Sequence, residues 1–207
     1  MEALPPGRSG STGSLPVDVL EEARHRLSWA CLVFLLGFLL AYFVPRVLFR
    51  ERLPDGEVVG AAAASASMVL AVVLAALCRF SRVATSRLLG LGLVFEVAGS
   101  FAIATSEVWS FYSPESLAVM PSVMVQGISW VNVWMIIFPA LVPATRARTI
   151  AATALSAPAV PLILVASHAY FGPPAEAHFY PQPLIGSALA GGISACLAIL
   201  TDRKSVV

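Results

Sequence analysis

One acidic residue stands in the middle of a long apolar stretch. Glu96 lies in LGLVFEVAGS, and no lysine or arginine lies at a similar position in that stretch. An ionised carboxylate at the centre of a bilayer costs about 2.5–3.5 kcal/mol. We therefore expect Glu96 to point into a helix bundle, where it is protonated or hydrogen-bonded. The expected donors lie on a later apolar stretch, namely Ser129, Asn132 and the indole N–H of Trp130 or Trp134.

Two functions stay open for the intramembrane polar site formed by Glu96, Trp130, Asn132 and Trp134. In the first, the site senses a ligand, a proton or a quinone. In the second, its hydrogen bonds only hold two helices together. At 3.6 residues per turn, most residues that share the face of Glu96 are small: Gly92, Leu93, Gly99, Ser100 and Ile103. We expect another helix to come close to this face and the opposite face to meet lipid.

The other residue types that do chemistry form no recognisable catalytic set. His168, Glu176 and His178 lie in or just before AYFGPPAEAHFYPQP, without the supporting ligands that a metal needs. The chain has no GxxxxGK[ST] loop and no kinase catalytic loop. We therefore expect no catalytic, cofactor-binding or metal-binding residue. The three cysteines form no CxxC pair and are expected to be small buried hydrophobes: Cys31, Cys78 and Cys196.

The elements that must position Glu96 are membrane helices. Of the 207 residues, 58% are hydrophobic and only 12% are charged, whereas about 25% are charged in soluble domains. Six runs are long enough to cross about 30 Å of hydrocarbon, and their continuous apolarity excludes the alternating pattern of a barrel. The chain is thus predicted to be an all-α, polytopic membrane helical bundle with six transmembrane helices. The runs are Leu27–Val44, Val58–Cys78, Leu88–Ser106, Gln126–Val142, Ile150–Tyr170 and Pro183–Leu200.

Arginine placement predicts the orientation of the bundle, because positive residues collect on the cytoplasmic side. With the N-terminus inside, three arginines lie in the first outer loop: Arg46, Arg50 and Arg52. Seven lie on the inner side: Arg24, Arg26, Arg79, Arg82, Arg87, Arg146 and Arg148. Both termini are therefore expected to be cytoplasmic. The net charge of +1 indicates no nucleic-acid partner.

The sequence divides into a tail, a short helix and a membrane domain. Residues 1–14 are rich in Pro, Gly and Ser and are expected to be disordered. Residues 15–26 are expected to form a short cytoplasmic helix, residues 27–200 the six-helix transmembrane domain, and residues 201–207 a short tail.

Prolines and small residues predict how the helices bend and pack. Trp130 and Trp134 are four residues apart and share a helical face. Proline pairs are expected to kink or end the fourth run and to kink the fifth: Pro139 and Pro143, then Pro158 and Pro161. Small residues recur along two further runs, and such faces allow close helix approach within the chain or in a homodimer. They are Gly60, Ala64 and Ser67, and the four-spaced pairs Gly186 with Ala190 and Ser187 with Gly191.

Three segments resemble the N-terminal membrane region of certain bacterial serine/threonine protein kinases. They are SLPVDVLEEARHRLSWACLVF, SRLLGLGLVFEVAGSFAIATSEVW and GISWVNVWMIIFPALVPATRARTIAATALSAPAVPLIL, within residues 14–200. The resemblance implies a membrane anchor and sensor in the bacterial inner membrane, followed by a cytoplasmic kinase domain. ATP and Mg²⁺ would bind only to that kinase domain.

The chain ends in DRKSVV, which contains Lys204, the only lysine beside twelve arginines. This ending is similar to the translation of a common sequencing adapter, so we expect residues 201–207 to be an artefact of a truncated reading frame. The alternative is a genuine short cytoplasmic tail.

Two other functions stay open. The chain could be a complete small polytopic protein, such as a transporter subunit with Glu96 as its coupling residue. The same module could also serve another output domain, such as a cyclase.

Overall fold

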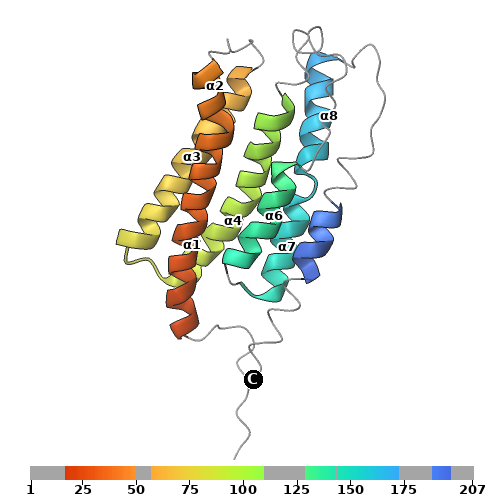
Figure 1. Ribbon diagram of the computed structural model, residues 1–207. Coiled ribbons are helices and arrows are strands. Elements are labelled where there is room, and N and C mark those ends of the chain that lie inside the picture. Colours follow the sequence, from red (N-terminus) through yellow and green to blue (C-terminus); the bar gives the residue numbers. More distant parts are fainter. Residues whose placement is uncertain (1–16, 50–56, 110–128, 143, 173–187, 197–207) are drawn as a thin grey trace, which may run out of the picture.

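The computed structural model describes residues 17–49, 57–109, 129–142, 144–172 and 188–196. Within these ranges the backbone is helical apart from short connections and contains no strand, which confirms the expected all-α class. The helices lie side by side in a bundle (Figure 1). The tail at residues 1–14 and the tail at residues 201–207 lie outside the described residues.

The first helix is longer than the sequence suggested. α1 (Val17–Phe38) passes without a break through the expected boundary between residues 15–26 and the first apolar run. It continues into a π-helical turn, η1 (Leu39–Phe43), and then into α2 (Val44–Phe49). Pro45 has no N–H to donate to the carbonyl four residues earlier, and a π turn in front of a proline accommodates that missing hydrogen bond.

The alanine-rich α3 (Glu57–Phe80) follows, and its small residues pack within the chain. A Cβ on Gly60 would lie 3.3 Å from the hydroxyl oxygen of Tyr42 and 3.5 Å from Cα of Ser106. Ala64 and Ser67 on the same face are also buried. This face is therefore used inside the bundle, and a homodimer could not also use it without unpacking the helix.

The next element, α4 (Thr85–Ala104), ends in a second π-helical turn, η2 (Thr105–Trp109). In this turn the hydroxyl of Thr105 donates to the carbonyl of Phe101 at 2.8 Å, and that of Ser106 donates to the carbonyl of Ala102 at 2.7 Å. Hydroxyls that bond back to the preceding turn compete with the backbone N–H groups and bend helices.

Prolines divide the last part of the bundle, as expected at Pro143 and Pro158, whereas Pro161 lies within the first turn of α8. α6 (Trp130–Leu141) contains Pro139 and ends two residues before Pro143, and the intervening Val142 is extended. The fifth run is split into α7 (Arg146–Ser156) and α8 (Ala159–Phe171) by a turn at Ala157 and Pro158. A proline disfavours helical geometry in the residue before it, which explains the extended conformation before Pro143. A further helix covers residues 188–196.

α4 is the central helix of the bundle. It contacts α1, α3, α6, α7 and α8. Half of its most apolar window is buried, against a third or less for the other long helices. The helix that carries Glu96 is therefore the one most enclosed by protein.

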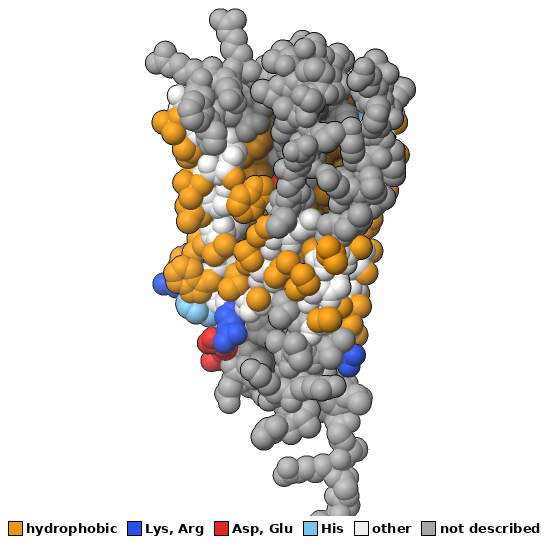
Figure 2. All heavy atoms as spheres, turned by 45° about the vertical axis from the view of Figure 1, so that its right-hand side comes forward, with side chains coloured by type: hydrophobic (Ala, Val, Ile, Leu, Met, Phe, Trp, Pro, Cys, Tyr) orange, Lys and Arg blue, Asp and Glu red, His pale blue; other side chains and the backbone are white. Residues whose placement is uncertain are grey.

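Four helical segments are long and apolar enough to cross a membrane, and the last of them joins α7 and α8 through their turn: Glu21–Phe43, Val58–Phe80, Thr85–Trp109 and Arg146–Phe171. Many large hydrophobic side chains remain exposed on them, and Figure 2 shows such side chains covering the middle of one face. Such a surface suits a lipid environment. The described parts of the fourth and sixth runs are shorter. α6 has 12 residues, about 18 Å in length, and the remainder of both runs lies outside the described residues.

The arginines whose side chains the structure describes gather at one end of the bundle. α1 begins there, α3 ends there, and α4 and α7 begin there (Figure 1). Seven arginines with described side chains therefore share this end, here called the arginine end: Arg24, Arg26, Arg79, Arg82, Arg87, Arg146 and Arg148.

Candidate functional site

Glu96 is fully buried in the centre of the bundle. It lies on the face of α4 that also buries Gly92, Gly99, Ser100 and Ile103. On the opposite face, Val94 is 64% exposed. The helical period therefore predicted the buried face of α4 correctly, and Glu96 points away from lipid.

Trp134 is the residue of α6 that meets Glu96. Its indole N–H donates to the main-chain carbonyl of Glu96 at 3.2 Å. The hydroxyl of Ser100 donates to the same carbonyl at 2.9 Å. The hydrogen bonds at this position thus go to the backbone of Glu96, whereas the sequence suggested that they would go to its carboxyl group.

Aromatic rings surround the contact. The ring centroid of Phe34 lies 4.8 Å from that of Trp134 and 4.9 Å from that of Phe95, and Phe95 and Trp134 are 5.8 Å apart. These three rings come from α1, α4 and α6 and meet in edge-on arrangements, which are favourable for aromatic pairs. The cluster fixes the position of Trp134 against α4.

Gly99 makes this close approach possible. A Cβ at Gly99 would lie 3.0 Å from Cε2 of Phe34 and 3.2 Å from Nε1 of Trp134. Any larger residue would push the aromatic cluster away from α4. The small residues expected to allow close helix approach therefore do so beside Glu96.

The carboxyl group of Glu96 has no hydrogen-bond partner among the described residues. Three more buried side-chain oxygens on neighbouring helices share this property: those of Asn132, Thr153 and Ser156. They lie on α6 and α7, and both helices contact α4. Buried polar atoms that lack partners are costly and point to a role beyond packing. The chemistry available at Glu96 is the uptake or release of one proton, or a hydrogen bond to a small polar ligand.

The other expected members of the site make no hydrogen bond to Glu96 among the described residues. Trp130 is 57% exposed although it is one turn from the buried Trp134. Ser129 donates to Glu107 at 2.6 Å and not to Glu96. Asn132 is buried, but it lies about 200° around α6 from Trp134 and therefore faces another side of that helix. Among the four residues proposed from the sequence, a hydrogen bond joins only Trp134 and Glu96.

Glu107 is a functional candidate that the sequence reasoning missed. Its carboxyl oxygens accept hydrogen bonds from the hydroxyl of Ser129 at 2.6 Å and from the backbone N–H of Trp130 at 2.8 Å. It therefore ties the end of η2 to the first turn of α6, where a negative charge interacts well with the helix dipole. The sequence does contain a signal for this pair. Glu107 is an acid at the end of one apolar run, and Ser129 is a helix-capping serine near the start of the next.

Residues with metal-ligand chemistry do not gather in the part of the chain that the structure describes, where no three His, Cys, Asp or Glu side chains form a group. Glu176 and His178 lie outside the described residues, and His168 is half-buried near the end of α8. Cys31 and Cys78 are buried as expected, but Cys196 is exposed. It lies on the helix that covers residues 188–196.

Comparison with known proteins returned no match: no protein-family model, no curated protein and no solved structure is similar to this chain. The residues themselves therefore carry the functional argument.

Proposed function

We propose that this chain is the membrane anchor and sensor module of a bacterial receptor-like serine/threonine protein kinase of the inner membrane. In this proposal six helices cross the bilayer and both termini face the cytoplasm, where a kinase domain follows the sixth helix. The kinase domain alone would bind ATP and Mg²⁺, through a glycine-rich loop, a strand lysine and a catalytic-loop aspartate.

The contact between Trp134 and Glu96 is the observation that supports this proposal. Trp134 belongs to GISWVNVW, the most distinctive block of the resemblance to such kinases. Its indole N–H bonds to the backbone of α4 at Glu96. α6 then ends at Leu141, and α7 begins at Arg146 at the arginine end. A change in the hydrogen bonding at Glu96 could therefore move α6, and α6 leads to the arginine end, where the kinase domain would attach.

A proton or a small polar ligand is the input that this site suits. Binding at the buried carboxyl would change the charge or the hydrogen bonding beside the carbonyl that Trp134 holds. A ligand shifts an equilibrium between two arrangements only if it binds them with different affinity. The backbone of Trp134 belongs to α6, whereas its indole bonds to α4. In this proposal the hydrogen bond between the two helices is present in one arrangement and broken in the other.

A transporter subunit is the second candidate function, and the carboxyl of Glu96 favours it. This group is fully buried and finds no partner among the residues that the structure describes. In a transporter, Glu96 would be the coupling residue that takes up and releases a proton. The same module serving a different output domain, such as a cyclase, is a variant of the sensor proposal.

Sequencing the DNA beyond codon 201 in an intact genome tests whether a kinase domain follows the membrane helices. The proposal expects an in-frame GxGxxG segment, followed by a strand lysine and an HRD-type catalytic loop. A stop codon in that genomic sequence, or a domain without these signatures, would overturn the kinase proposal.

The full-length protein in proteoliposomes tests the sensor. We expect Glu96→Gln and Trp134→Phe to change the rate of autophosphorylation and to reduce its dependence on pH. Val94→Ala is the matched control, because this side chain lies on the exposed face of the same helix. Equal autophosphorylation in all variants would refute signalling through this site. Proton flux that Glu96→Gln abolishes would support the transporter instead.

A further inference from the structure

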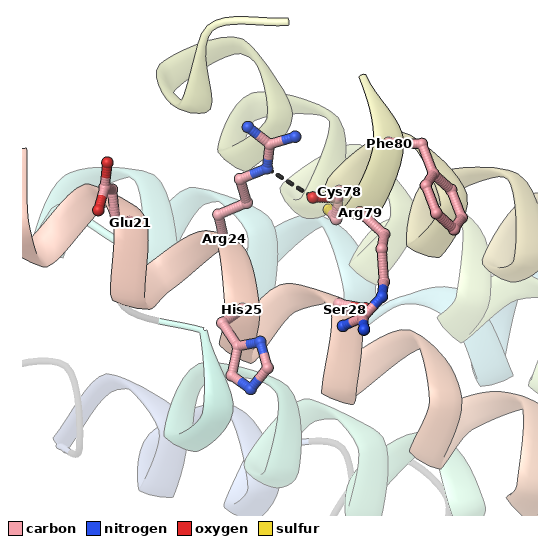
Figure 3. A pocket seen from close by; sticks show the side chains of 7 residues that line it. All are labelled: Glu21, Arg24, His25, Ser28, Cys78, Arg79 and Phe80. Atoms are coloured by element: carbon pink, nitrogen blue, oxygen red, sulfur yellow. Dashed lines mark hydrogen bonds between the residues drawn. The ribbon is translucent and has the colours of Figure 1, made fainter. Parts of the chain in front are cut away.

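A polar pocket opens between the first turns of α1 and the last turn of α3. Its volume is about 400 Å³. Figure 3 shows side chains from both helices around it. The lining residues are Glu21, Arg24, His25, Ser28, Cys78, Arg79 and Phe80.

Arg24 closes the α3 side of this pocket. Its Nε donates to the carbonyl of Cys78 at 2.5 Å, and one terminal nitrogen donates to the carbonyl of Ser81 at 2.5 Å. These carbonyls are among the groups that a helix end leaves without intrahelical partners. The guanidinium therefore neutralises the negative end of the α3 dipole, and its second terminal nitrogen makes no hydrogen bond to the described residues.

Arg79 provides a second positive charge and has no ion-pair or hydrogen-bond partner among the described residues. His25 adds a donor. The indole N–H of Trp29 donates to Nε2 of His25 at 2.9 Å, so Nε2 is the acceptor nitrogen and Nδ1 is the ring nitrogen left to donate. Ser28 contributes a hydroxyl. The pocket thus offers guanidinium, imidazole and hydroxyl donors, which together suit a phosphate group.

The pocket lies where lipid headgroups would be. Glu21 begins the first apolar span and Phe80 ends the second. Phe80 is 82% exposed, and exposed aromatic residues at the ends of spans mark the membrane interface.

The charge around the pocket is positive. The seven arginines of the arginine end face only two acids with described side chains, Glu21 and Glu22. Glu22 is already paired with Arg26 at 2.9 Å. Glu21 lines the pocket but lies seven residues before Ser28 on α1, about 10 Å along the helix. One end of the pocket can therefore hold an anion away from this carboxylate.

We propose that this pocket binds the phosphate of an anionic phospholipid of the cytoplasmic leaflet. Arg79 is the principal ligand, because its guanidinium can form a bidentate pair with phosphate oxygens. Arg24, Ser28 and His25 complete the site, and the acyl chains of the lipid lie against Phe80 and the exposed surface of α3. The bound lipid joins α1 to α3 at the arginine end. This inference does not depend on a kinase domain, and the leaflet that it names rests on the orientation given under the proposed function.

Lipid titration of the purified full chain in a neutral detergent tests the proposal. Bound lipid is counted by native mass spectrometry, with phosphatidylglycerol as the probe and phosphatidylcholine as the zwitterionic comparison. We expect tighter binding of phosphatidylglycerol. Arg79→Gln should weaken it about tenfold or more, the size expected for one lost charge-assisted hydrogen bond. The matched control is Arg148→Gln, because Arg148 is exposed at the same end but does not line the pocket.

Three outcomes would overturn the inference. Equal weakening by Arg79→Gln and Arg148→Gln would mean general charge attraction and no site. Equal affinity for the two lipids would mean that the anionic charge is not recognised. Full competition by millimolar inorganic phosphate would mean a site for a soluble anion. Arg79→Lys is the control for misfolding. It keeps the positive charge but loses the bidentate geometry, so this variant should bind phosphatidylglycerol with intermediate affinity.

Discussion

Replacing Glu96 with methionine should make the membrane bundle more stable. The carboxyl is fully buried, and neither oxygen has a partner among the described residues. A buried polar group without a partner costs about 1–3 kcal/mol. Methionine is also unbranched, and it adapts to irregular space in cores. The two hydrogen bonds at this position go to the backbone carbonyl of Glu96 and would survive the substitution.

The expected gain in the free energy of unfolding is about 1–2 kcal/mol, because imperfect packing of the new side chain offsets part of the relief. The assay is unfolding of the full chain in mixed micelles by increasing SDS, followed by helical circular dichroism. Trp134→Phe is the comparison. It removes the donor to the Glu96 carbonyl and should lower the same free energy by about 1 kcal/mol.

A loss of 1 kcal/mol or more in Glu96→Met would refute this reasoning. It would mean that the carboxyl holds helices together through a partner. A gain would mean that the chain keeps an acid here against its own stability, which is the pattern of a functional group.

Three further predictions follow from the packing and the charge pattern. Gly99→Ala should destabilise the bundle by about 1 kcal/mol or more in the same SDS assay, because the new methyl group meets the aromatic cluster. Gly37→Ala is its control and should be neutral or stabilising, since nothing lies within 4 Å of the added atom; equal effects of the two would contradict the tight packing at Gly99. Reporter fusions after Arg87 should report the cytoplasm and a fusion near Glu115 the outside, and the reverse would overturn the predicted orientation. The 207-residue chain should transfer no phosphate from ATP in a radiolabel assay, because it contains no GxxxxGK[ST] loop and no kinase catalytic loop; transfer by a contaminant-free preparation would show that this reasoning is wrong.

Composition and periodicity alone were sufficient for the class of fold and for the buried face of α4. Long apolar runs can satisfy their backbone hydrogen bonds in lipid only as helices, so the all-α class needs no knowledge of neighbours. The period of 3.6 residues places Gly92, Glu96 and Gly99 on one side of a helix, and a charged group must avoid lipid. Local rules also predicted that α6 would end near Pro143.

The partners of each polar group were decided only by the tertiary structure. Trp134 bonds to the carbonyl of Glu96 rather than to its carboxyl, because the depth at which α6 meets α4 sets which atom the indole reaches. Glu107 meets Ser129, 22 residues away, because two helices place their ends at the same level. Arg24 reaches the carbonyls of α3 for the same reason. Periodicity within one helix specifies a direction around its axis, whereas hydrogen bonds between helices also depend on their relative height and rotation, which arise only when the whole bundle packs.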